Sequence, residues 1–151
     1  MNKSVSTLAI IATTIFAFSI SSCKKHNEHD IDHDGHTMLN INYPAAYVVN
    51  GASNNLSVIK LSDNTVSETI ALNGAIFPHH IYINPAKTKL AVAITSKDLS
   101  VGHGVHGGST VGLKVQIIDV VTGNIDKEII VNKLPHNAVY NTLGTELWIP
   151  Q

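Results

Sequence analysis

The second part of the chain repeats itself, and this feature constrains the fold more than any other. The segment 56–72, LSVIKLSDNTVSETIAL, aligns with 115–131, VQIIDVVTGNIDKEIIV, so that Leu56 matches Val115. The segment 78–93, PHHIYINPAKTKLAVA, aligns with 135–150, PHNAVYNTLGTELWIP, so that Pro78 matches Pro135. A shorter run, AYVVNG at 46–51, aligns with LAVAIT at 90–95. Repetition at this spacing is typical of propellers and solenoids.

Each repeat consists of short β-branched runs separated by turns rich in Asn, Asp, Gly, Pro and Lys, a pattern that predicts strands. No part of it has helical periodicity of useful length. Because four antiparallel strands make one propeller blade, we predict an all-β fold, a β-propeller with about two four-stranded blades. Compared with a four-stranded blade, the first unit lacks its first strand and the last unit ends after its second strand. We therefore expect an incomplete ring. The predicted strands lie near 46–50, 56–61, 66–72, 80–84, 89–95, 113–120, 125–131, 137–141 and 146–149.

The motifs AYVVNGASNNLSVIKLSDNTVSETIAL and PHHIYINPAKTKLAVAI resemble the YVTN family of bacterial β-propeller repeats, which pairs a YVTN…NTVSVID half with a P…GVAVSPDG…YV half. The resemblance covers residues 43–151 and implies a propeller, while leaving the function open. The turns NPAKTK and NTLGTE replace the family's Pro-Asp-Gly turn, and histidine stands where the family has small residues. Asp119 is similar to the aspartate of the SVID motif, and we expect it to bond loop backbone.

Residues 1–22 are predicted to be a lipoprotein signal peptide. Lys3 precedes an apolar stretch that ends at Ile20, too short for a typical membrane-spanning helix. ISSC at 20–23 resembles the bacterial lipobox, which implies cleavage before Cys23 and acylation of this residue. The alternative is a plain signal peptide with an incidental cysteine. Lys24 follows, which in the enterobacterial sorting rule directs a lipoprotein to the outer membrane. We therefore expect a lipid-anchored cell-envelope protein, facing the periplasm or the cell surface.

Residues 23–42 are rich in His, Asp and Asn and are predicted to form a solvated tether to the folded part, 43–151. The stretch 26–38 contains four carboxylates and four histidines, so it is a candidate site for Cu(II), Ni(II) or Zn(II). A plain polar spacer fits equally well. DIDHDG copies the start of an EF-hand loop, but Ile41 occupies the position of the bidentate glutamate, which excludes that calcium site. The four tether histidines are His26, His29, His33 and His36.

Histidines of the folded part are predicted to share one face of the propeller. Strands alternate in direction, so the loops before first strands and between second and third strands lie at the same end of the sheets. Imidazole is a preferred ligand of copper and zinc, so we predict a transition-metal site on this face. The alternative is that surface loops simply collect polar residues. The candidate ligands are His79, His80 and His136, at the starts of first strands, and His103 and His106, in the loop SVGHGVHGGSTVG.

Two further resemblances concern the cofactor. The adjacent pair His79–His80 is similar to the pair that holds copper in the propeller of nitrous oxide reductase. The repeated Pro-His, at 78–79 and 135–136, is similar to the haem-binding histidine of cytochrome cd-type nitrite reductase. They imply copper or another transition metal, with haem less favoured, and a redox or electron-transfer protein.

A binding or scaffold module is nevertheless our leading hypothesis, with a protein or small-molecule ligand on the histidine-bearing face. A redox protein is the alternative, and a tether that captures metal for a partner is the third. The sequence offers no catalytic constellation: GHGVHG at 102–107 fits G-x-G-x-x-G, but a strand follows it instead of a helix. All ten basic residues are lysines, and the absence of arginine argues against nucleic acid as a partner.

Overall fold

A computed structural model describes residues 38–100 and 111–151, and in these residues the chain forms strands and no helix. The all-β prediction is therefore confirmed for the described part, and each predicted strand is present with ends close to those expected. Nothing in this part could cross a membrane as a helix. The strands are β1 (Ala45–Asn50), β2 (Asn55–Lys60), β3 (Thr65–Ala71), β4 (Pro78–Ile83), β5 (Lys89–Ile94), β6 (Lys114–Asp119), β7 (Ile125–Ile130), β8 (Val139–Tyr140) and β9 (Leu147–Trp148).

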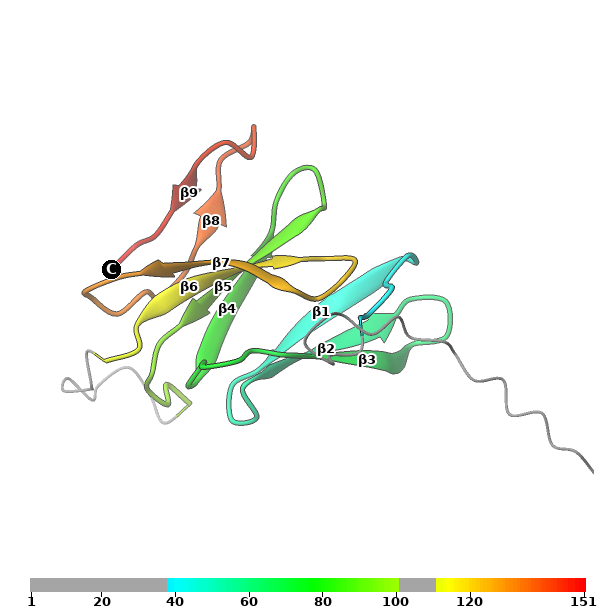
Figure 1. Cartoon of the computed structure of the whole chain (residues 1–151), viewed down its shortest axis with the longest axis horizontal. Helices are drawn as coiled ribbons and strands as arrows, with labels where there is room; N and C mark the ends of the chain where they lie inside the picture. Colours follow the sequence, from blue (N-terminus) through cyan, green and yellow to red (C-terminus); the bar gives the residue numbers. More distant parts are fainter. Residues whose placement is uncertain (1–37, 101–110) are drawn as a thin grey trace, which may run out of the picture.

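The strands form three antiparallel sheets, β1-β2-β3, β4-β5-β6-β7 and β8-β9, in which each strand pairs with the next along the chain. Figure 1 shows the sheets following one another in chain order. The grouping of three, four and two strands is the one that the repeat alignment predicts. Within the described residues the sheets do not close into a ring, which would need at least about four blades.

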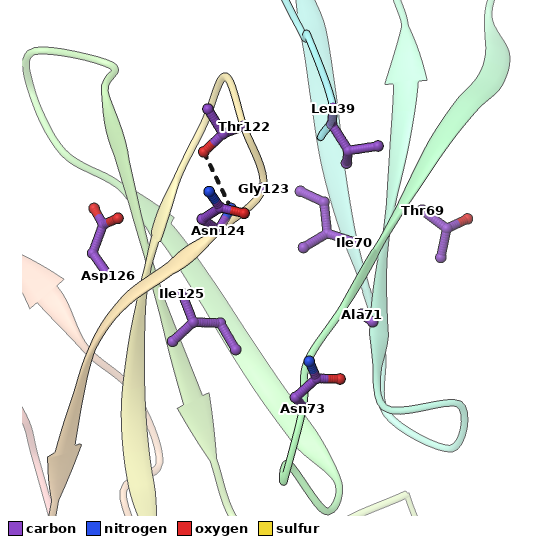
Figure 2. Close-up of a pocket in the computed structure, with 10 residues that line it drawn as sticks. All are labelled: Leu39, Thr69, Ile70, Ala71, Asn73, Thr122, Gly123, Asn124, Ile125 and Asp126. Atoms are coloured by element: carbon purple, nitrogen blue, oxygen red, sulfur yellow. Dashed lines mark hydrogen bonds between the residues drawn. The ribbon is translucent and has the colours of Figure 1, made fainter. Parts of the chain in front are cut away.

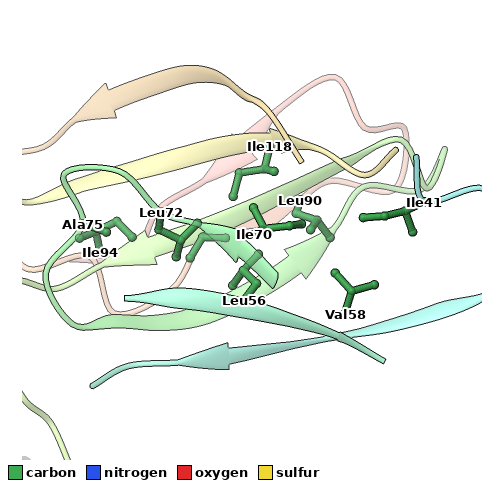
Figure 3. Packing of buried hydrophobic residues seen from close by; sticks show 10 residues of the cluster. Ile41, Leu56, Val58, Ile70, Leu72, Ala75, Leu90, Ile94 and Ile118 are labelled. Atoms are coloured by element: carbon green, nitrogen blue, oxygen red, sulfur yellow. The ribbon is translucent and has the colours of Figure 1, made fainter. Parts of the chain in front are cut away.

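The main hydrophobic core lies between the first two sheets (Figure 3). In β2 every second side chain points inward, as period-two alternation requires, so Leu56 and Val58 are buried while Ser57 and Ile59 lie on the other face. The second sheet contributes alternate residues of β5 to the same core. The buried members of this core are Ile41, Leu56, Val58, Ile70, Leu72, Ala75, Leu90, Val92, Ile94 and Ile118.

A smaller core lies between the second and third sheets. Its fully buried members are Ala91, Val115 and Ala138. The middle sheet is therefore covered on both faces, which explains why β5 continues after Lys89 as an unbroken apolar run, LAVAI, instead of alternating with polar residues. Partly buried side chains complete this core: Ile117, Ile129, Tyr140, Leu147 and Ile149.

The β4–β5 and β8–β9 turns share one hydrogen-bond pattern. Asn84 Oδ1 accepts from the amides of Thr88 at 2.8 Å and Lys89 at 3.0 Å. At the equivalent place in the second repeat, Asn141 Oδ1 accepts from the amides of Thr145 at 2.9 Å and Glu146 at 3.3 Å. A side chain that bonds its own downstream backbone is a recurrent turn device, so Asn84 and Asn141 stabilise the two equivalent turns in the same way.

Asp119 ends β6 and ties down the following turn, as the sequence predicts. Its Oδ1 accepts from the amides of Val121 at 3.0 Å and Thr122 at 2.9 Å. Its Oδ2 accepts from Lys89 Nζ at 2.8 Å, and the same ammonium also bonds Asp126. Hydrogen bonds from Lys89 to Asp119 and then to Asp126 raise the pKa of the lysine to about 12.

Candidate metal centre

Three histidines meet where the second sheet adjoins the third. His79 and His80 belong to β4, and His136 lies in the segment that leads into β8. One ligand nitrogen from each ring lies within 4.8 Å of the other two. The ring centroids are 4.2 Å apart for the adjacent pair, and His136 lies 5.1 Å from His79 and 5.2 Å from His80. Residues that occupy equivalent places in the two repeats, His79 and His136, thus belong to one cluster.

A β-bulge brings the adjacent pair together. Successive residues of a regular strand point to opposite faces, but the β4–β5 register shifts so that Pro78 pairs with Ile94 and His80 pairs with Ala93. His79 is the extra residue, and a bulge of this kind re-aims side chains. The two rings consequently meet edge to face, at an interplanar angle of 85°. The apolar and polar pattern alone does not reveal this bulge.

The residue before this bulge has an unusual backbone. Phe77 adopts φ 51°, a left-handed conformation that is rare for a bulky residue. Two neighbouring side chains hold it there: the Phe77 amide donates to Asn54 Oδ1 at 2.9 Å, and its carbonyl accepts from Thr95 Oγ1 at 2.7 Å. Such conformations persist only where the surroundings fix them, and they concentrate at functional sites. The entry to β4 is therefore held in place around the histidine pair.

His136 is positioned from the third sheet. The proline before it, Pro135, is fully buried, and Pro78, which precedes His79, is buried as well. The His136 amide donates to the carbonyl of Pro150 at 3.3 Å, which extends the β8–β9 ladder to the histidine. The buried prolines anchor both Pro-His segments, so the imidazoles are presented from fixed backbone.

Burial and donor chemistry suit a metal ion. His79 and His80 are half-buried, whereas His136 is exposed. Among the described residues His80 Nδ1 is shielded from solvent and has no hydrogen-bond partner, a state that costs about 1–3 kcal/mol. A metal ion bound at His80 Nδ1 would remove this cost. An all-imidazole ligand set suits copper, nickel and zinc, whereas calcium and magnesium require oxygen ligands.

No protein-family model and no curated protein matches the chain. The histidine cluster itself is therefore the feature that indicates a function.

Of the five histidines predicted to share one face, the structure brings three together. His103 and His106 fall in 101–110, outside the described residues, and their participation stays a prediction. The same holds for the predicted acylation site, Cys23, and for the tether ligands His26, His29, His33 and His36.

A pocket of about 600 Å³ lies elsewhere, between β3 and the β6–β7 turn (Figure 2). Its walls include the apolar side chains of Ile70 and Ile125 and a polar rim from the turn. Asp126 is the only ionisable residue among those that line it, and its carboxylate is bonded to Lys89. These residues offer neither a nucleophile with a base nor a set of metal ligands, so the histidine cluster remains the stronger candidate site.

Proposed function

We propose that the folded part of the chain binds a divalent transition metal ion, Cu(II), Ni(II) or Zn(II), through His79, His80 and His136. The observation that carries the proposal is the convergence of their ligand nitrogens within 4.8 Å. Three imidazoles are a known ligand set for zinc and copper, and such sites keep a position open for solvent or a ligand. The exposed side chain of His136 supports a site at the protein surface.

The proposed setting is the cell envelope. The three sheets are interpreted as consecutive blades of a YVTN-type β-propeller, anchored to a membrane through acylated Cys23. Support comes from the 3-4-2 grouping of the strands, the face-to-face packing of the sheets and the matching turns at Asn84 and Asn141. In this setting the metal site belongs to a binding module displayed at the membrane surface.

A copper-dependent electron carrier is the second candidate function, favoured by the adjacent imidazole pair. It differs from a plain binding module in one measurable respect. The copper-loaded chain should cycle reversibly between Cu(II) and Cu(I), seen as loss and return of its paramagnetic resonance signal. A copper site that cannot be reduced without releasing the metal would leave the binding module alone.

The proposal is tested by titrating the full chain, held in a non-ionic detergent, with Zn(II) or Cu(II) in a calorimeter. His80→Asn is the sharpest variant, because the second repeat carries Asn137 at the equivalent position, so the segment tolerates asparagine. Affinity should fall at least about 100-fold, since loss of mere outer-sphere partners already costs about 10–100-fold. His79→Asn and His136→Asn should act in the same direction.

Deleting residues 26–38 provides the control, because it removes the four tether histidines and leaves the cluster intact. The shortened chain should keep the tight site. If the deletion abolishes binding while the three substitutions leave it unchanged, the tether holds the metal and the proposal is wrong.

A further inference from the structure

The ligands of the proposed metal centre come from two different sheets. His79 and His80 are part of the four-stranded sheet, while His136 is joined through the Pro150 carbonyl to the two-stranded one. A single ion bound by all three imidazoles would therefore be a direct link between the sheets.

The two-stranded sheet has little else to hold it. β8 and β9 pair through only two residue pairs, Val139 with Trp148 and Tyr140 with Leu147. A hairpin of two strands is marginal in water by itself. The core beneath it has three buried residues among those described, two of them alanines, against ten in the core between the first two sheets. Trp148 is 66% exposed. The β8–β9 sheet is thus the unit expected to open first.

The geometry of coordination favours the closed arrangement. Tetrahedral Zn(II), with bonds of about 2.0–2.1 Å, holds its nitrogen ligands about 3.4 Å apart. The structure holds the three nitrogens within 4.8 Å of one another, so a small inward movement of the imidazoles completes the site while the β8–β9 sheet stays in place. When the β8–β9 sheet lifts away, this ligand leaves the other two. The ion therefore binds the closed form more tightly, and it must shift the equilibrium toward that form.

We infer that metal occupancy locks the β8–β9 sheet onto β4, so that the centre acts as a metal-dependent clamp between neighbouring sheets. The inference rests on the proposed metal site and adds to it a conformational consequence. The magnitude follows from linkage: at a free Zn(II) concentration about 100 times its dissociation constant, the open population falls about 100-fold.

Amide hydrogen exchange read by mass spectrometry tests this, with the full chain in detergent, with and without Zn(II). Peptides covering 135–150 should exchange up to about 100-fold more slowly with zinc, while peptides covering β2 in the same sample should be unchanged. His136→Asn should abolish the protection, because the remaining ligands both lie on β4. Lys133→Ala, an exposed change in the same connecting segment, should respond to zinc as the unaltered chain does.

The outcomes distinguish the proposed metal site from the proposed clamp. If calorimetry detects no binding at the cluster, the proposed function fails and the clamp fails with it. If zinc binds at the cluster but exchange in 135–150 is unaltered, the site stands and the clamp is wrong. The metal-free exchange of His136→Asn should equal that of the unaltered chain, which shows that the variant is folded.

Discussion

Asp119 shows how a single carboxylate joins a strand, its turn and a neighbouring strand. Burial alone would raise its pKa, but the hydrogen bonds from Lys89 and from the amides of Thr122 and Val121 outweigh burial and lower the pKa to about 2. In the unfolded chain an aspartate titrates near about 3.9. The folded state therefore prefers the ionised form of this carboxyl group.

This preference makes the contribution of Asp119 to the free energy of unfolding depend on pH. Because the folded pKa is the lower one, the contribution is complete above about pH 4 and is lost as the pH falls towards 2. We expect Asp119→Asn to lower the free energy of unfolding at pH 7 by about 1–2 kcal/mol, allowing for its partial exposure. The variant should also show a shallower loss of stability between pH 4 and pH 2.

Urea denaturation followed by circular dichroism at several pH values measures both effects. Asp63→Asn is the matched control, because this aspartate also bonds a nearby backbone amide, that of Thr65, but is fully exposed. Its effect should be clearly smaller. Equal losses in the two variants would contradict the role assigned to Lys89 and the β6–β7 turn.

At the scale of elements, the two matching turns differ at one informative position. Lys87 has φ 58° and Gly144, its equivalent in the second repeat, has φ 72°. This left-handed conformation costs a residue with a Cβ atom about 1–2 kcal/mol, and glycine avoids the cost. A Cβ atom at position 144 would also come within 3.3 Å of Pro85 Cδ.

Exchanging the residues should therefore change stability in opposite directions. We expect Gly144→Ala to destabilise the chain by about 1 kcal/mol, and Lys87→Gly to stabilise it by a few tenths, because part of the gain is lost to the freer unfolded chain. Thermal unfolding of the purified variants checks both signs. Lys87→Ala keeps the Cβ atom and should be nearly neutral, so a stabilising alanine would show that the lysine side chain, not its backbone, matters.

The strands were predictable because their signals are local. Period-two alternation puts Leu56 and Val58 on one face of β2, and the apolar run of β5 fits a strand covered on both sides. From the sequence it was predictable that His79 and His80 lie at the same end of the sheets as the other histidines, but not that their two rings meet. This meeting depends on a bulge and on the left-handed Phe77, whose backbone bonds the side chains of Asn54 and Thr95, residues distant in the sequence. Such distant partners leave no mark in a local pattern.

At the scale of the whole molecule, comparison of equivalent positions in the repeats shows which apolar side chains are exposed on the first and third sheets. Val92 in β5 is fully buried against the first sheet, whereas its equivalent Val48 in β1 is 43% exposed. Ala91 is fully buried against the third sheet, whereas its equivalent Trp148 in β9 is 66% exposed. The same positions of the repeat are thus covered in the middle sheet and open in the described outer sheets. Apolar side chains grouped on a sheet face favour association.

We therefore expect the chain expressed from residue 24 to self-associate as its concentration rises, and Val48→Lys or Trp148→Lys to suppress this. Val48 projects from the outer face of the first sheet, because its neighbours Tyr47 and Val49 pack inward. Trp148 projects from the outer face of the third sheet, because its neighbours Leu147 and Ile149 pack inward. Each substitution should change the free energy of unfolding by no more than about 0.5 kcal/mol. Sedimentation velocity over a range of concentrations measures the association. Ser62→Lys adds the same charge in the exposed β2–β3 turn and should leave association unchanged; if it suppresses association equally, net charge is the cause and the outer faces are not.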